Sequence, residues 1–154
     1  MAHNHSICVL TALFEAEQIC AEKGLRLTNT RRRVLEMVWA SHQAVKAYDL
    51  IDRFDQEKGT TKPPTIYRAL DFLVENGLAH KIESLNAFVG CNHPGGKHQG
   101  NFLICGSCEQ ISEFEENEAT SSIELLAKEK GFEISTKTIE IHGICKKCQN
   151  SGKT

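Results

Sequence analysis

Residues 80–108 read HKIESLNAFVGCNHPGGKHQGNFLICGSC, and this stretch holds three of the seven cysteines and three of the seven histidines of the 154-residue chain. Thiolate sulfur and imidazole nitrogen are ligands that zinc binds well. Such a dense group of them in mid-chain predicts a metal-binding joint. The sequence before it reads as a small helical module, and the sequence after it reads as a scaffold that completes the metal sites.

The composition is that of an ordinary folded protein, with 40% apolar and 25% charged residues. No apolar run approaches the roughly 18 residues that a membrane-spanning helix needs, and the first residues lack the pattern of a signal peptide. We therefore expect a cytoplasmic protein without a membrane partner, whose cysteines stay reduced. The formal net charge of −2 gives no general reason to expect nucleic-acid binding, so local patterns must provide one.

Apolar residues at helical spacing predict three helices in the first part of the chain. The first is expected at residues 8–23, before Gly24. Thr28 can cap the second helix, and the third is a short helix around Tyr48 that Gly59 ends.

Three arginines, Arg31 to Arg33, fall in the first turn of the second predicted helix. The helix dipole favours anions at that end, so three cations there are unfavourable unless negatively charged groups lie beside them. A run of charge is usually a solvated face. Alternatively, these side chains contact phosphate groups, which would make the placement favourable.

The motif Lys62-Pro-Pro-Thr-Ile-Tyr-Arg-Ala-Leu70 starts a fourth predicted helix, because proline is tolerated in the first helical turn. Helical spacing places the apolar side chains on one face and Arg68 on the opposite face, with Thr65 and Tyr67 beside it. Any amphipathic surface helix has outward charges. This layout nevertheless suits a recognition helix, from which an arginine can pair with guanine in the major groove.

Two short alternating segments follow, at residues 78–83 and 87–89, with a turn between them. Three helices, a fourth that begins with proline, and a hairpin together predict a winged helix-turn-helix. The alternation places His80 on the same side of its strand as Leu78 and Ile82, facing inward or towards the joint.

The two Cys-x-x-C motifs, Cys105 to Cys108 and Cys145 to Cys148, are the strongest metal signal. Four thiolates in two pairs suit a structural zinc and leave no open position for catalysis, so we do not expect an enzyme. A pair of redox dithiols is the alternative, but the thioredoxin-like context that would favour it is missing. The surrounding elements are expected to be strands at residues 101–105, 110–114 and 132–141, a helix at 119–130, and a disordered tail at 149–154.

A second candidate metal site combines His80, Cys91, His98 and Glu113, which come from the hairpin, the linker and the strand after the first Cys-x-x-C motif. Ligands from both halves of the chain would cross-link them, and a thiolate favours Zn²⁺ over Fe²⁺ or Mn²⁺. Against this, His98 can be a solvated loop residue and Glu113 one member of an acidic run. His93 can also replace His98.

Six motifs in order resemble the ferric uptake regulator superfamily, specifically its zinc uptake regulator branch. They are Leu25-Arg-Leu-Thr28, Ala47-Tyr-Asp-Leu50, the Lys62 to Leu70 motif, His80-Lys-Ile-Glu-Ser84, Phe102-Leu-Ile-Cys-Gly-Ser-Cys108 and His142-Gly-Ile-Cys-Lys-Lys-Cys148. The resemblance covers residues 19–148 and implies an α+β fold. Its expected parts are a winged-helix DNA-binding domain at residues 1–91, a hinge at 92–99, and a small α/β dimerisation and structural-zinc domain at 100–154.

The resemblance implies a homodimeric, zinc-responsive repressor of zinc uptake and homeostasis genes that binds double-stranded operator DNA and takes no small-molecule substrate. Two Zn²⁺ ions per chain are expected. The structural zinc maps onto Cys105, Cys108, Cys145 and Cys148, and the regulatory zinc maps onto His80, Cys91, His98 and Glu113. The family's DNA contacts fall on Tyr48, Lys62, Tyr67 and Arg68, and Thr65 is expected beside them.

Two other functions stay open. Within the superfamily, the signal can be iron or peroxide. However, iron-sensing relatives carry a histidine three residues before the first Cys-x-x-C cysteine, and Phe102 stands there in this chain. Outside it, a zinc-buffering protein would use the same ligands without any DNA, but it would leave the Lys62 to Leu70 motif unexplained.

Overall fold

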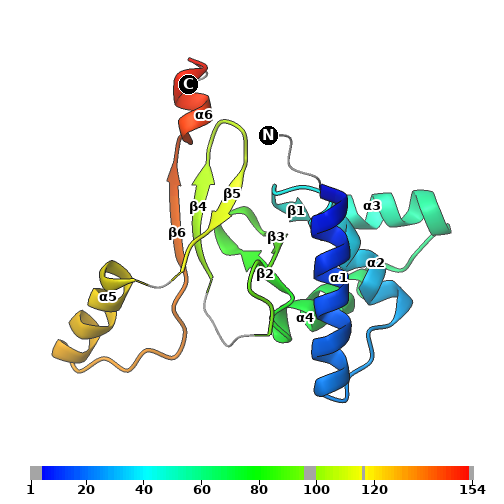
Figure 1. Cartoon of the computed structure of the whole chain (residues 1–154), viewed down its shortest axis with the longest axis horizontal. Coiled ribbons are helices and arrows are strands. Elements are labelled where there is room, and N and C mark those ends of the chain that lie inside the picture. Colours follow the sequence, from blue (N-terminus) through cyan, green and yellow to red (C-terminus); the bar gives the residue numbers. More distant parts are fainter. Residues whose placement is uncertain (1–4, 96–99, 116, 153–154) are drawn as a thin grey trace. The chain divides into compact units, whose positions relative to one another are not determined.

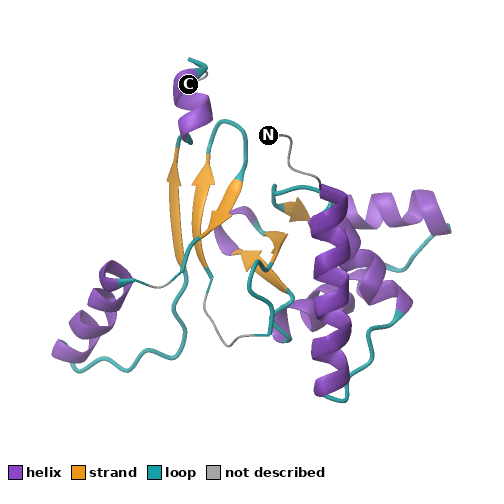
Figure 2. Cartoon of the chain, viewed as in Figure 1, coloured by secondary structure: helices purple, strands orange, loops and turns teal. Residues whose placement is uncertain are grey.

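The computed structural model describes residues 5–95, 100–115 and 117–152. The chain forms two compact units, Met1–Lys97 and His98–Thr154. Both contain helices and strands, so the predicted α+β class is confirmed (Figure 2). No helix in the described ranges is long and apolar enough to cross a membrane.

The first unit contains the four helices that the sequence predicted. They are α1 (His5–Glu22), α2 (Asn29–Trp39), α3 (Ala47–Lys58) and α4 (Pro63–Glu75) (Figure 1). The Thr28 hydroxyl accepts a hydrogen bond from the Arg31 N–H at 3.4 Å and caps α2. Gly59, with φ of 80°, follows α3 and ends it.

A small antiparallel sheet completes the first unit. Its strands are β1 (Val45–Lys46), β2 (Ala79–Ile82) and β3 (Ala87–Gly90), in the order β1-β3-β2. β2 and β3 form the predicted hairpin, in which Ala79 pairs with Gly90. The turn between them is the short 3₁₀ helix η1 (Glu83–Leu85), which Asn86 ends with φ of 46°. Strand β1 was not predicted, because two residues are too few to show the alternation of apolar and polar side chains that marks a strand.

The core of the first unit holds α4 by one face only. Leu35 of α2, Leu50 of α3, and Ile66 and Leu70 of α4 are almost fully buried together. The opposite face of α4, which includes Arg68, is exposed. The amphipathic layout predicted for this helix is therefore confirmed.

The second unit is a three-stranded sheet with two helices. Its elements are β4 (Asn101–Cys105), β5 (Ile111–Glu113), α5 (Glu118–Glu129), β6 (Ile139–Gly143) and α6 (Lys146–Asn150). The strand order is β5-β4-β6, with β5 antiparallel and β6 parallel to β4. Its core is small: among the described residues the buried apolar side chains are Phe102, Ile104, Cys105, Ile111 and Cys148.

Two predictions for the end of the chain were wrong. The strand expected at residues 132–141 begins only at Ile139, because the alternation before it does not reflect burial. Phe132 is 69% exposed, whereas Lys137 is buried and its ammonium group pairs with Glu124 at 2.8 Å. Gln149 and Asn150, the first two residues of the tail that was expected to be disordered, belong to α6.

Leu70→Ala tests how α4 is held. Removing a buried leucine side chain should lower the free energy of unfolding of the first unit by about 2–5 kcal/mol, whereas Val74→Ala, on the partly exposed side of the same helix, should cost much less. Denaturant unfolding followed by the fluorescence of the single tryptophan measures both. Equal losses would show that the buried face does not anchor the helix.

Candidate metal centre and DNA-binding surface

The two Cys-x-x-C motifs meet because the strands that lead into them are parallel neighbours. Cys105 is the last residue of β4, and its register partner Gly143 is the last residue of β6. Strands that run in the same direction end at the same edge of a sheet, so both motifs begin there. The Gly106 N–H donates to the Gly143 carbonyl at 2.9 Å and extends the pairing beyond β4.

The four thiols of these motifs form a compact cluster in the second unit. The sulfur atoms of Cys105, Cys108, Cys145 and Cys148 all lie within 4.8 Å of one another. Tetrahedral zinc with Zn–S bonds of about 2.3 Å would separate two sulfurs by about 3.8 Å. The sulfurs of Cys108 and Cys145 are 3.7 Å apart. The donor set and its dimensions therefore fit a four-thiolate zinc site.

Backbone amides favour the ionised form of one thiol in this cluster. The Cys145 N–H, 3.3 Å from the Cys105 sulfur, has the largest effect, and the N–H groups of Cys108 and Ser107 add to it. Together they lower the pKa of Cys105 to about 6. The Gln110 N–H lowers the pKa of Cys108, but the neighbouring Cys105 thiol and burial outweigh it and raise that pKa to about 11. A divalent cation would relieve the repulsion that opposes further ionisation.

Two of the predicted regulatory ligands lie close together in the first unit. His80 is on β2 and pairs with Val89 of β3, and Cys91 directly follows β3. A ring nitrogen of His80 and the Cys91 sulfur lie within 4.8 Å of each other. His80 is half-buried and Cys91 is almost fully buried. The hairpin therefore brings an imidazole and a thiol to one place.

The other two predicted regulatory ligands belong to the second unit. Glu113 is the half-buried last residue of β5. His98 lies outside the described residues, whereas its alternative His93 is exposed in the bend after Cys91. Phe102, the residue that disfavoured iron sensing in the sequence, is 1% exposed and belongs to the core.

The predicted DNA-contacting side chains are exposed and gather at the starts of two helices. Tyr48 is in the first turn of α3 and is 70% exposed. Lys62 immediately precedes α4, and Thr65, Tyr67 and Arg68 lie in the first turns of that helix. All four are exposed. The start of a helix presented in this way is the usual part of a recognition helix to reach base edges.

The arginines at the start of α2 are engaged within the protein. The Arg31 guanidinium lies 3.6 Å from the centroid of the Phe72 ring of α4, a cation–π contact. The other two form a chain of ion pairs that joins α1, α2 and α3, in the order Glu17, Arg32, Glu36, Arg33 and Glu57.

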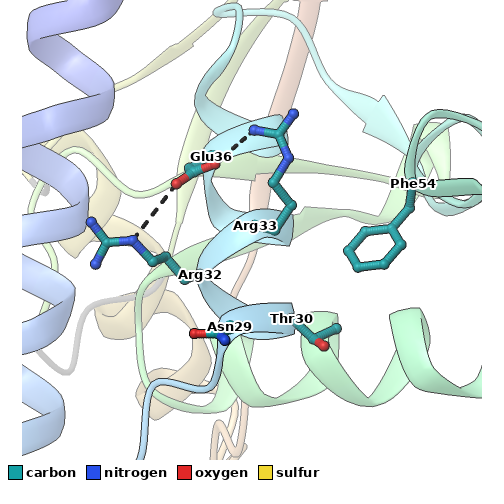
Figure 3. Close-up of a pocket in the computed structure, with 6 residues that line it drawn as sticks. All are labelled: Asn29, Thr30, Arg32, Arg33, Glu36 and Phe54. Carbon is teal, nitrogen blue, oxygen red and sulfur yellow. Dashed lines mark hydrogen bonds and ion pairs between the residues drawn. The ribbon is translucent and has the colours of Figure 1, made fainter. Parts of the chain in front are cut away.

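Glu36 is the centre of that ion-pair chain. Figure 3 shows it between Arg32 and Arg33, at a pocket of about 380 Å³ that Phe54 of α3 also lines. These arginines thus connect helices, a role that neither the solvated face nor the phosphate contact considered from the sequence includes. Sequence reasoning missed the pairs, although Glu36 lies three and four residues after the two arginines, the spacing at which helical side chains meet.

Comparisons with known proteins agree with this arrangement. The sequence matches the model of the ferric uptake regulator family over residues 22–149. The zinc uptake regulation protein of Escherichia coli (strain K12) is 39% identical over 139 residues, which cover 88% of this chain and 80% of that protein. The peroxide operon regulator of Bacillus subtilis (strain 168) is 27% identical over 141 residues, which cover 88% of this chain and 92% of that protein.

Solved structures extend the similarity to the whole fold. A zinc uptake regulator complexed with zinc and DNA matches with a TM-score of 0.87 at 36% identity, and the match covers 95% of this chain and 98% of that one. Holo XcZur matches with a TM-score of 0.82 at 42% identity, over 96% of this chain and 99% of that one. The winged-helix fold predicted for the first unit is thereby confirmed. The chain belongs to the ferric uptake regulator family.

Proposed function

We propose that this protein is a zinc-responsive, sequence-specific DNA-binding repressor of zinc uptake and homeostasis genes. The observation that carries the proposal is the match, over 95% of the chain, to a zinc uptake regulator complexed with zinc and DNA. The greater similarity to a zinc uptake regulation protein than to a peroxide operon regulator favours zinc as the signal. Binding to chromosomal operators would place the protein in the cytoplasm.

The four-cysteine cluster is proposed to hold a structural zinc. Cys105, Cys108, Cys145 and Cys148 would bind the ion as thiolates and leave no open position on it. Zinc there would join β4 to the segment after β6. Because the second unit buries so few apolar side chains, this cross-link would supply much of the stability of that unit.

A second zinc is proposed to be the signal. His80 and Cys91, which the hairpin brings together, would bind it with His98 and Glu113, giving two zinc ions per chain. We propose the boundaries 1–91 for the DNA-binding domain, 92–99 for the hinge and 100–154 for the dimerisation domain. Ligands contributed by all three parts would restrain the hinge when the ion is bound.

Regulation would follow from that restraint. With His80 and Cys91 held, the protein would favour the conformer in which the two α4 helices of a dimer match two half-sites of an operator. The coupling is reciprocal, so operator DNA would also tighten zinc binding. Tyr48, Lys62 and Arg68 would then contact the DNA, Arg68 by reaching a base edge.

A homodimer is proposed because the second unit exposes many large apolar side chains. They are Leu103, Ile123, Leu125, Leu126, Phe132 and Ile141. Exposed apolar surface on this scale usually marks an interaction site. A second copy of the chain, which presents the same surface, would cover it around a two-fold axis.

Cys91→Ser tests the signalling site. This variant should fold and keep its structural zinc, but lose the second zinc and the increase in operator affinity that zinc causes, because a hydroxyl is a poor zinc ligand. Native mass spectrometry counts the zinc, and gel shifts use a duplex enriched from a random pool with zinc-loaded protein. Cys8→Ser, a half-buried thiol outside both sites, is the matched control.

The contrasting variant Cys105→Ser should lose the structural zinc and unfold the second unit. Operator binding by Cys91→Ser that still required added zinc would remove Cys91 from the sensor.

Arg68→Ala tests the DNA-binding surface. Loss of one base contact should weaken operator binding by about 1–3 kcal/mol and relax the preference at one base pair. Fluorescence anisotropy with the same duplex at fixed salt measures the loss. Lys23→Ala, which also removes an exposed cation from the first unit, should change the affinity little. Equal effects would indicate only general electrostatic attraction.

Leu125→Asp tests the dimer interface. A carboxylate at this apolar position should shift the zinc-loaded protein towards monomers, because burying the charge is costly. Lys128→Asp places the same group at an exposed polar position of α5 and should leave the assembly intact. Sedimentation velocity measures both variants. A Leu125→Asp protein that sediments like the parent would exclude this part of α5 from the interface.

A further inference from the structure

The single tryptophan lies directly against the backbone of the hairpin. Trp39 is the last residue of α2, and Gly90 is the last residue of β3. A Cβ atom at Gly90 would stand 2.3 Å from Cε2 and 2.4 Å from Nε1 of the Trp39 indole. No side chain fits there without moving the indole. Gly90 therefore lets the ring pack on the strand at the position that precedes Cys91.

The segment that carries Cys91 has protein contacts on both sides of this residue. The Cys91 N–H donates to the Leu78 carbonyl at 3.3 Å, and the side chain is 1% exposed. Further on, Gly95, with φ of 84°, lies against Ile19 of α1, whose Cδ1 would be 3.0 Å from a Cβ at that glycine. Helix α2 thus contacts the residue before the candidate ligand, and α1 contacts a residue four positions after it.

The same helix that ends in Trp39 packs on α4. At its first turn, Arg31 stacks on Phe72 of α4. Further along α2, Leu35 and Val38 share a buried core with Leu70 and Leu73 of α4. A close-packed helix moves as a unit, so a displacement at its carboxyl end also shifts the side chains that pack against α4.

We infer that Trp39 is a positioning residue that couples zinc binding at Cys91 to the recognition helix α4. The inference rests on the proposed function and adds the route by which the signal travels within the first unit. When the Cys91 sulfur binds zinc, the metal bond adds to these contacts and restrains the backbone at Gly90 further. The indole seated on Gly90 then fixes the carboxyl end of α2, and with it the orientation of α4.

Fluorescence reports on the first step of this route. Because Trp39 is the only tryptophan, its emission should change as the second zinc binds to the full-length protein. The change should be absent in Cys91→Ser, where no metal bond adds to the contacts of the backbone next to the indole. A wild-type protein that takes up the second zinc with no change in emission would overturn the inference.

Substitutions at the contact test the second step. The quantity to measure is the coupling ratio, defined as the operator dissociation constant without the second zinc divided by that with it. Trp39→Ala should lower this ratio roughly fivefold or more, within the usual range of allosteric coupling. Trp39→Phe keeps an aromatic ring and should retain most of it. Gly90→Ala should lower the ratio like Trp39→Ala, and the double variant should lose no more than either single variant.

Val9→Ala separates coupling from stability. Val9 is a partly buried residue packed on the same core, so its truncation should lower the thermal midpoint and leave the coupling ratio unchanged. An equal fall of the ratio in this variant would make the Trp39 effect a loss of stability and would contradict the inference.

The outcomes also separate the inference from the function. If Cys91→Ser abolishes the coupling ratio but Trp39→Ala and Gly90→Ala keep it, the inference fails and the proposed function stands. If the wild-type ratio is one, both fail.

Discussion

The scarcity of buried apolar side chains in the second unit is the constraint on which the rest of the structure depends. Among the described residues, the buried hydrocarbon side chains of this unit are Phe102, Ile104 and Ile111. The other two buried apolar positions are Cys105 and Cys148, which are thiols of the proposed zinc site. A sheet with so small a core needs a cross-link or a partner to stay folded. The parallel pairing of β4 and β6 puts the four thiols where the proposed zinc ion would provide that cross-link, and the exposed apolar residues would provide the surface for the proposed partner.

The first unit, in contrast, has an extensive apolar core of its own. Its core joins all four helices to the hairpin, so it needs no metal to hold α4 in place, and the outer face of that helix remains exposed for DNA. A metal bound at His80 and Cys91 would therefore act on a domain that is already folded. Its effect would be on position, because restraining a domain that is already folded changes which arrangements of its helices are populated, including the orientation of α4 on the core. This division separates the structural role proposed for one zinc from the signalling role proposed for the other.

Much of this architecture could be predicted from the sequence. Local chemistry determines the helix starts at Thr28 and Pro63 and the inward face of α4, and the two Cys-x-x-C motifs are recognised by their ligand spacing, although the parallel pairing of β4 and β6 is what brings them together. Strand β1 has no local signal, since its two residues form a strand only by pairing with β3. The alternation of apolar and polar residues after Phe132 wrongly predicted a strand, because it does not follow burial there: Lys137 is buried and forms an ion pair. The contact between Trp39 and Gly90 joins residues far apart in the chain, and a glycine before a cysteine does not reveal which side chain it accommodates.

The most direct test of zinc-dependent DNA binding is to measure operator binding by the wild-type protein while free zinc is buffered over a wide range and bound zinc is counted per chain. We predict that operator affinity rises as occupancy increases from one zinc to two, with the first ion retained at the lowest free zinc. Operator affinity that does not change with zinc, or occupancy that stays at one while affinity rises, would contradict the assignment of His80 and Cys91 to a zinc sensor.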